Sequence, residues 1–233
     1  MVERVLYDLA GADPALRFSP YCWRAELALA HKGLAVDTVP WRFTDKDAIA
    51  FSGQGRVPVL VDGERTVSDS WAIALYLEEA YPDRPSLFGA SAAVAVTRFV
   101  NAWADTILHG GMIRLIVSDI ADIVHEKDRA YFRESREQRF GMPLEQVTAG
   151  REERLKAFRE TLLPLRHTLS AQPYLAGEAP AYADYIVFGS FQWARCCSSF
   201  ELLAPDDVVA AWRERMLGLF DGLARKAPCA VAA

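Results

Sequence analysis

The stretch Phe18-Ser19-Pro20-Tyr21-Cys22-Trp23 follows the first apolar run of the chain and decides how its N-terminal half is interpreted. Its residue order is typical of a strand end that turns directly into a helix. Proline is favoured at the first helical position, and the serine before it is a good N-cap. The first backbone N–H groups of a helix have no partner within the helix, so they favour an anion. The stretch therefore predicts an anion site over Ser19.

The bulk composition excludes several classes of protein. Of the 233 residues, 52% are hydrophobic and 24% are charged, which is typical of a globular protein. The net charge of −5 argues against a sequence-independent nucleic-acid binder, which needs a basic face. The chain has no apolar run of about eighteen residues and no basic-then-apolar N-terminus, so we expect neither a membrane span nor a secretory leader. The four scattered histidines predict no metal site.

The cysteines indicate the compartment. Cys22, Cys196, Cys197 and Cys229 show no disulfide spacing, so the sequence predicts a reducing, cytoplasmic location. The adjacent pair Cys196-Cys197 lies in an apolar helical pattern and is interpreted as core packing.

Periodicity divides the chain into two domains. In residues 1–82 it predicts strands over 3–9, 36–41, 56–62 and 65–67, helices over 20–32 and 70–81, and a short helix over 44–50. The order is βαβαββα, an α/β unit. Two prolines and a glycine then mark residues 83–91 as a linker. Residues 92–233 show helical periodicity alone, so the second domain is predicted to be an all-α bundle.

Three features of the helical half carry specific expectations. Gly110-Gly111 should interrupt the apolar stripe that begins at residue 96. Pro164 should kink a long helix near residue 160. Residues 181–199 form the most apolar segment and should run through the middle of the bundle. Asp184 stands at the acidic position of an N-terminal capping box whose hydroxyl position holds Ala181, so half of the box remains.

The dipeptide Val57-Pro58 lies inside an alternating run. Proline removes a ladder hydrogen bond, so it belongs on an edge strand or serves a special purpose. A cis peptide bond would turn the backbone groups of Val57 outward, where an extended peptide can pair with them. The simpler interpretation is an edge strand with a trans proline, and the isolated dipeptide favours it because the cis form is uncommon even before proline.

The pair Asp69-Ser70 opens the next helix. Its simple interpretation is helix capping. The sharper interpretation is that Ser70 and the helix N-terminus hold a ligand carboxylate while Asp69 holds a ligand amine. Such caps occur in most proteins, so the pair alone decides nothing.

The ordered combination of these motifs resembles the glutathione transferases, whose N-terminal domain is thioredoxin-like and whose C-terminal domain is helical. The resemblance covers essentially the whole chain. Within that superfamily, the chain is most similar to the bacterial β-etherases of lignin-fragment breakdown and to related fungal etherase-like transferases. The stretches that carry this similarity are Phe18–Arg24, Arg56–Val59, Asp69–Ile73, Ser135–Gln138 and Ala183–Tyr185.

The resemblance implies glutathione as the co-substrate and a set of roles. Val57, with Pro58 in the cis form, would pair with the cysteinyl backbone of glutathione, and Asp69 and Ser70 would bind its γ-glutamyl end. Ser19 would lie beside the sulfur. Gln54 or Arg56 is assigned to the glycyl carboxylate from position and charge only. The family further implies a homodimer.

Free-energy estimates support Ser19 as a stabiliser of the thiolate. A free thiol titrates near ~8.5, and a shift of roughly two pKa units, about 2.7 kcal/mol, gives a mostly ionised form at neutral pH. A hydroxyl that donates to a charged sulfur contributes on the order of 1.5–3 kcal/mol, and a helix N-terminus adds ~0.3–1 kcal/mol. Ser19 would therefore be the catalytic residue as a hydrogen-bond donor, and the nucleophile would be glutathione.

Cys22 suggests a rival chemistry. Ser-Pro-Tyr-Cys resembles the glutaredoxin motif Cys-Pro-Tyr-Cys with its first cysteine replaced by serine at position 19. That first cysteine is the nucleophile of thiol–disulfide exchange, so its loss argues against an ordinary oxidoreductase. We expect Cys22 to be a small core residue.

The second substrate should lie between the loop 10–18 and the first helices of the bundle. Trp103, Met112, Arg114 and Tyr131 are predicted to form its walls, although an aromatic on a helical stripe is more often core. The predicted function is transfer of glutathione to a hydrophobic, aromatic electrophile, with β-aryl ether cleavage as the etherase-like version. The alternatives are a glutathione-dependent isomerase or reductase, and a non-catalytic carrier of glutathione or other ligands.

Overall fold

A computed structural model describes residues 4–229 of the chain. Its N-terminal part contains β1 (Arg4–Leu9), α1 (Pro20–His31), β2 (Asp37–Trp41), the 3₁₀ helix η1 (Lys46–Ser52), β3 (Val59–Asp62), β4 (Arg65–Ser68) and α2 (Ser70–Ala80). This is the predicted βαβαββα order, and the thioredoxin-like α/β class is confirmed.

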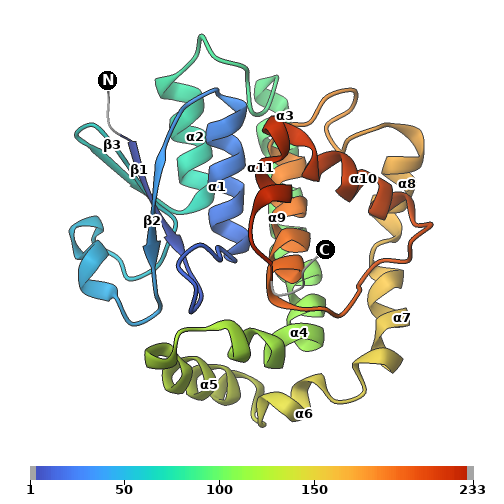
Figure 1. Cartoon of the computed structure of the whole chain (residues 1–233). Helices are drawn as coiled ribbons and strands as arrows, with labels where there is room; N and C mark the ends of the chain where they lie inside the picture. The colour runs from blue at the N-terminus through green and yellow to red at the C-terminus, as the bar shows by residue number, and fades with distance from the viewer. Residues whose placement is uncertain (1–3, 230–233) are drawn as a thin grey trace.

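The four strands form one mixed sheet in the order β2-β1-β3-β4. β1 pairs with β2 in parallel, whereas β3 runs antiparallel to both β1 and β4. In Figure 1, α1 and α2 lie between this sheet and the helical half of the molecule. The loop between β1 and α1 therefore emerges where the two halves meet.

The C-terminal part is all-helical, as predicted. It contains α3 (Ser91–Trp103), the π-helical segment η2 (Ala104–Leu108), α4 (His109–Ile123), α5 (Glu126–Phe140), α6 (Leu144–Thr148), α7 (Arg151–Thr161), α8 (Leu163–Ala171), α9 (Tyr182–Cys197), α10 (Val208–Leu217) and α11 (Leu219–Lys226). Helix α9, in which every residue except Arg195 is buried, runs through the middle of the bundle (Figure 1), but, contrary to the prediction, it is not the most apolar helix. Within residues 4–229, no helix has the length and apolarity needed to cross a bilayer.

Two expectations about the helical half need correction. Gly110-Gly111 does not interrupt a helix: α3, η2 and α4 follow one another without a loop, and both glycines lie inside α4. A Cβ atom on Gly111 would stand 2.8 Å from Cδ2 of Phe158, so this glycine permits close packing rather than a turn. The kink expected near residue 160 is instead a break at Leu162, because Pro164 lies in the first turn of the new helix α8.

The contact between α1 and α9 joins the two domains. Gly189 of α9 lies against the start of α1: a Cβ atom there would stand 2.5 Å from the carbonyl oxygen of Pro20 and 3.3 Å from Cγ of Arg24. The missing side chain lets the two helices approach closely. The first turn of α1, which carries Ser19 as its N-cap, is therefore held directly against the helical domain.

Gly189→Ala should lower the free energy of unfolding by about 1–3 kcal/mol, because the added methyl group overpacks a rigid backbone contact. The matched control is Gly110→Ala, also inside a helix but with nothing within 4 Å of the added Cβ. That variant should be more stable by about 0.5–1 kcal/mol. Chemical denaturation measures both, and equal effects of the two substitutions would contradict the packing argument.

Candidate functional site

A cavity of ≈ 840 Å³ lies between the N-terminal domain and the helices α4 and α5. The N-terminal domain lines it with, among others, Ser19, Tyr21, Phe43, Lys46, Gln54, Arg56 and Val57. The helical domain lines it with Asp105, His109, Ile113, Tyr131, Phe132, Arg136, Arg139 and Trp193, among others. The cavity is therefore formed by both domains, and it includes the residue predicted to activate the thiol.

Ser19 is the N-cap of α1. Its backbone is extended, with φ −70° and ψ 125°, and its Oγ accepts a hydrogen bond from the N–H of Cys22 at 3.2 Å. Only 4% of the residue is exposed, yet it lines the cavity. Because the oxygen accepts from the helix, the hydroxyl hydrogen can be donated to a group in the cavity. The α1 N-terminus and this hydroxyl together form an arrangement that stabilises an anion.

The Val57–Pro58 peptide bond is cis, as the family resemblance implies, so the simpler trans interpretation is wrong. Strand β3 begins only at Val59, and Val57 lies before it on the cavity wall rather than inside a strand. The strand expected over residues 56–62 is therefore shorter than predicted at its start.

Asp69 lies next to this turn and has an unusual backbone conformation. Its φ is +78°, in a region that side-chain-bearing residues seldom adopt. Its N–H donates to the carbonyl oxygen of Pro58 at 3.2 Å, and its Oδ1 accepts from the N–H groups of Trp71 and Ala72 at 2.9 and 3.1 Å. The hydrogen bonds tie the cis-proline turn to the start of α2. A strained residue held in this way is typical of a functional site.

The remaining predicted glutathione contacts lie near by. Gln54 and Arg56 line the cavity, and the Gln54 amide donates to the carbonyl oxygen of Arg56 at 2.7 Å. Ser70 is 2% exposed, and its carbonyl oxygen accepts from the Tyr182 hydroxyl at 2.6 Å. The residues that line the cavity together with Ser19 are Gln54, Arg56 and Val57. The other three residues, Pro58, Asp69 and Ser70, lie off this wall, at or before the start of α2.

Three of the four residues expected to surround the second substrate lie off the cavity wall. Tyr131 lines it, but Met112 is fully buried in the core, and Trp103 is half-buried against the core. Arg114 lies over the ring of Phe140, 5.3 Å from its centroid. Residues on a helical stripe more often belong to the core, and this holds for Met112 and Trp103.

Sequence reasoning missed the polar residues of the helical wall, above all His109 and Asp105. Together with Arg24 they form a network across the domain boundary. The buried Arg24 Nη2 donates to Asp105 Oδ1 at 2.8 Å and lies 3.5 Å from His109 Nε2. His109 Nε2 also lies 2.7 Å from Ser190 Oγ, and its Nδ1 lies 3.4 Å from the Tyr21 hydroxyl. The signal in the sequence that could have revealed these residues is the four-residue spacing between Asp105 and His109.

The charges around His109 assign its tautomer. Burial, and then Arg24, lower the pKa of His109 to about 3, so the ring is neutral near neutral pH. The Arg24 cation lies by Nε2, and the Asp105 carboxylate lies 3.8 Å from Nδ1. This favours a hydrogen on Nδ1 and a lone pair on Nε2 that accepts from Ser190. Nδ1 then donates to the oxygen of Tyr21.

Tyr21 is therefore held as a donor on the cavity wall. Its hydroxyl oxygen accepts from His109, so its own hydrogen is free to point into the cavity. Burial, and then Asp105, raise the pKa of Tyr21, so the phenol stays protonated near neutral pH. The guanidinium carbon of Arg24 lies 4.7 Å from the centroid of the Tyr21 ring, and this cation–π contact holds the ring in place. The cavity thus carries two hydroxyl donors, Ser19 and Tyr21, on one helical turn.

Cys22 faces the interior and not the cavity. It is fully buried, and burial followed by the nearby Asp8 carboxyl raises its pKa well above the usual value for a thiol. A protonated, buried thiol is a poor nucleophile. This environment fits the core role expected for Cys22.

Known proteins with similar sequences match both halves of the chain. The family model "Glutathione S-transferase, N-terminal domain" matches residues 14–85, and "Glutathione S-transferase, C-terminal domain" matches residues 95–221. Glutathione S-transferase 4 of Zea mays is 28% identical over 86% of this chain and 87% of its own length. Glutathione S-transferase Z1 of Arabidopsis thaliana is 41% identical over 69 residues, so the match spans 28% of this chain and 31% of that relative.

Solved structures share the fold over nearly the whole chain. Glutathione transferase GSTFuA3 from Phanerochaete chrysosporium is similar with a TM-score of 0.83 and 24% identity, covering 95% of this chain and 98% of its own. A glutathione S-transferase of Ceriporiopsis subvermispora, solved in complex with glutathione, has a TM-score of 0.81 and 25% identity, covering 95% of this chain and 99% of its own.

The two domain models match in the expected order, and the C-terminal one alone covers more than half of the 233 residues. Ser19 at the start of α1, the cis Val57–Pro58 bond and the cap at Asp69 all belong to the N-terminal domain. The chain belongs to the glutathione S-transferase family.

Proposed function

We propose that this protein transfers glutathione to an aromatic electrophile, with Ser19 as the residue that stabilises the thiolate. The observation that carries the proposal is the Ser19 hydroxyl. It caps α1, lines the cavity, and accepts from the Cys22 N–H so that its hydrogen remains available. A sulfur within hydrogen-bond reach of Ser19 would face the open volume in which an electrophile can approach.

Glutathione would extend from the cavity across the turn that joins β3 to α2. The backbone of Val57 would pair with the cysteinyl residue. Asp69, which is exposed, would bind the γ-glutamyl amine, and the N-terminus of α2 at Ser70 would bind the carboxylate. Gln54 or Arg56, both on the cavity wall, would take the glycyl carboxylate. Each assignment pairs a ligand charge with a protein group of opposite charge or polarity.

The electrophile would occupy the side of the cavity formed by the helical domain. Phe132, Tyr131 and Trp193 line that side, and Phe43 of the N-terminal domain lies against Phe132, which favours a flat aromatic substrate. In the etherase-like reaction, the thiolate forms a bond to the carbon α to a ketone. The C–O bond breaks, and its electron pair leaves with the phenolate oxygen, which then takes up a proton. Tyr21 would donate a hydrogen bond to the oxygen that gains charge.

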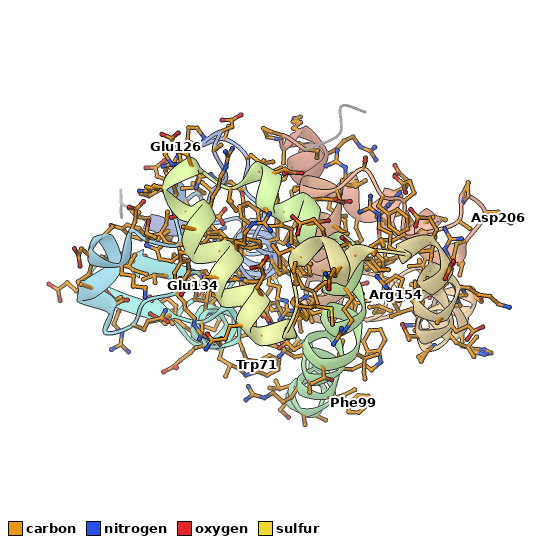
Figure 2. The ribbon with its side chains drawn as sticks, turned by 90° about the horizontal axis from the view of Figure 1, so that it is seen from below. Trp71, Phe99, Glu126, Glu134, Arg154 and Asp206 are labelled. Atoms are coloured by element: carbon orange, nitrogen blue, oxygen red, sulfur yellow. The ribbon has the colours of Figure 1, made fainter. Side chains whose placement is uncertain are left out.

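We also propose that the active species is a homodimer and that it acts in the cytoplasm. Val96 and Phe99 of α3 are 66% and 71% exposed, and Phe99 lies at the edge of the molecule in Figure 2. Exposed apolar side chains on one helix support burial against a second copy of the chain. All four cysteines are free, which suits a reducing compartment.

Ser19→Ala should raise the pKa of the bound thiol by about 1–2 units, because the thiolate loses a charge-assisted hydrogen bond. The rising limb of the pH–rate profile should move to higher pH by the same amount. Activity should therefore be lost at neutral pH and partly recovered in alkali. Ultraviolet titration of the bound thiolate measures the shift directly, and calorimetry should show glutathione still binding.

The matched control is Ser19→Thr, which keeps the hydroxyl and should keep most of the shift. A Ser19→Ala variant with an unchanged pH profile would refute the role assigned to Ser19.

Tyr21→Phe should lower kcat/KM for an α-aryloxy ketone about ten- to a hundredfold, because a hydrogen bond to a charged oxygen is lost. With benzyl chloride, which has no oxygen to stabilise, the loss should be at most about twofold. Steady-state kinetics on the two substrates measures this contrast. The control is Tyr7→Phe on β1, since Tyr7 lies outside the cavity wall. Equal losses on both substrates would show that Tyr21 does not donate to substrate oxygen.

Phe99→Glu should weaken the dimer, because it places a charge in the proposed apolar contact. Light scattering after size exclusion should then give the mass of a monomer at concentrations where the parent is dimeric. Leu163→Glu, on the exposed side of α8, serves as the control and should leave the mass unchanged. A parent protein that is monomeric at every concentration would contradict the proposal.

A further inference from the structure

The wall of the cavity carries an excess of positive charge, although the chain as a whole has a net charge of −5. Lys46 and Arg56 lie on the N-terminal side, and Arg136 and Arg139 lie on α5. The only carboxylate among the residues that line the cavity is Asp105. Asp105 is already paired with the buried Arg24 at 2.8 Å. The charges of the wall therefore favour an anionic occupant.

Arg136 is the cation most firmly built into this wall. Its guanidinium carbon lies 5.0 Å from the centroid of Phe43 and 4.6 Å from that of Phe132, so two aromatic rings fix the plane of the group. Its Nη1 donates to Ser135 Oγ at 2.8 Å. The side chain is half-buried, and no carboxylate of residues 4–229 lies within 4.0 Å of its nitrogens. Several of its N–H donors remain for a ligand.

The neighbouring arginine on the same helix behaves differently. Arg133 lies on the outer face of α5 and pairs with Glu137 at 3.0 Å and with Glu145 at 2.8 Å. Carboxylates are thus available on and beside α5, but they neutralise Arg133 and not Arg136. Burial, and then the nearby cations Arg139 and Arg56, lower the pKa of Arg136. A cation held in this environment without a counter-ion is stabilised when an anion binds.

Glutathione alone does not account for these charges. Its γ-glutamyl carboxylate is assigned to α2, and its glycyl carboxylate needs one partner, for which Gln54 and Arg56 are already at hand. Arg136 lies instead beside the aromatic residues assigned to the electrophile, Phe43 and Phe132. In Figure 2, α5 crosses the front of the molecule, with Glu126 at its start and Glu134 along its length. Arg136 therefore lies on the helix that forms the proposed electrophile side of the cavity.

We propose that Arg136 forms an anion subsite that binds a carboxylate on the aromatic electrophile. The proposal rests on the proposed transferase function and names its substrate class: aromatic acids rather than neutral aromatics. The planar fork of the guanidinium matches a carboxylate, and Phe43 and Tyr131 on the cavity wall would contact the substrate ring. Arg139 and Lys46, which also line the cavity, add long-range attraction for an anion.

The test compares two electrophiles that react in the same way, 1-chloro-2,4-dinitrobenzene and 4-chloro-3,5-dinitrobenzoate. In both reactions the thiolate sulfur forms a bond to the ring carbon, and chloride leaves with the electrons of the C–Cl bond. The parent protein should have the higher kcat/KM for the benzoate. In Arg136→Gln the ratio of the two kcat/KM values should fall about ten- to a hundredfold, mainly through KM. Added salt should reduce the preference of the parent protein.

Two variants control for charge and folding. Arg136→Lys keeps the positive charge but lacks the planar guanidinium, so it should retain part of the preference for the benzoate. Arg129→Gln removes an exposed cation from the same helix, outside the cavity wall, and should leave the ratio unchanged. If the ratio is unchanged in Arg136→Gln, the subsite is refuted. It is also refuted if Arg136→Gln weakens glutathione binding as strongly as it raises the KM of the benzoate, because Arg136 then serves glutathione.

Binding separates this proposal from the transferase function. Calorimetry with the two finished glutathione conjugates needs no turnover. Tighter binding of the carboxylated conjugate, lost in Arg136→Gln, would support the subsite even in a protein that does not catalyse the transfer. Equal binding of both conjugates by the parent protein would refute the subsite and leave the transferase proposal standing.

Discussion

The buried guanidinium of Arg24 is the interaction on which the two-domain arrangement depends. It projects from α1, is fully buried, and bonds to Asn101 at 3.1 Å and to Asp105 at 2.8 Å in the other domain. A charge removed from water in this way is tolerated only when its partners are held in good geometry. Because those partners belong to the helical domain, α1 cannot shift relative to α3 and η2 without leaving a buried charge unpaired.

A second buried polar contact also joins the two domains. The carboxylate of Asp128, at the start of α5, accepts from the backbone N–H groups of Phe43 and Thr44 at 2.9 and 3.1 Å and from the Thr44 hydroxyl at 2.6 Å. Asp128 is 1% exposed. Both connections cross the domain boundary. The separation between the two walls of the cavity is therefore a property of domain docking, and substitutions far from Ser19 can alter it.

The sequence predicted the N-terminal half well because its signals are local. The cap at Ser19 and the acidic cap at Asp69 each determine structure within a few residues. The cis bond at Pro58 was not decided by its dipeptide and needed the combined motif. The helical wall of the cavity could not be predicted, because its members are determined by the rotation of α4 and α5 against α1. Periodicity places a residue on a face of its helix but does not say what that face meets.

The π-helical segment η2 has a consequence for how the two domains are joined. A π turn holds one residue more than an α turn, and each residue of a helix adds about 100° of rotation. Deletion of a single residue within Ala104–Leu108 would let α3 continue into α4 as a regular helix. Because the regular turn would cover the same rotation with one residue fewer, the side chains of α4 would keep their faces, and His109 would stay beside Tyr21. An irregular turn of five residues thus takes up one extra residue without rotating the fifteen-residue helix that follows it.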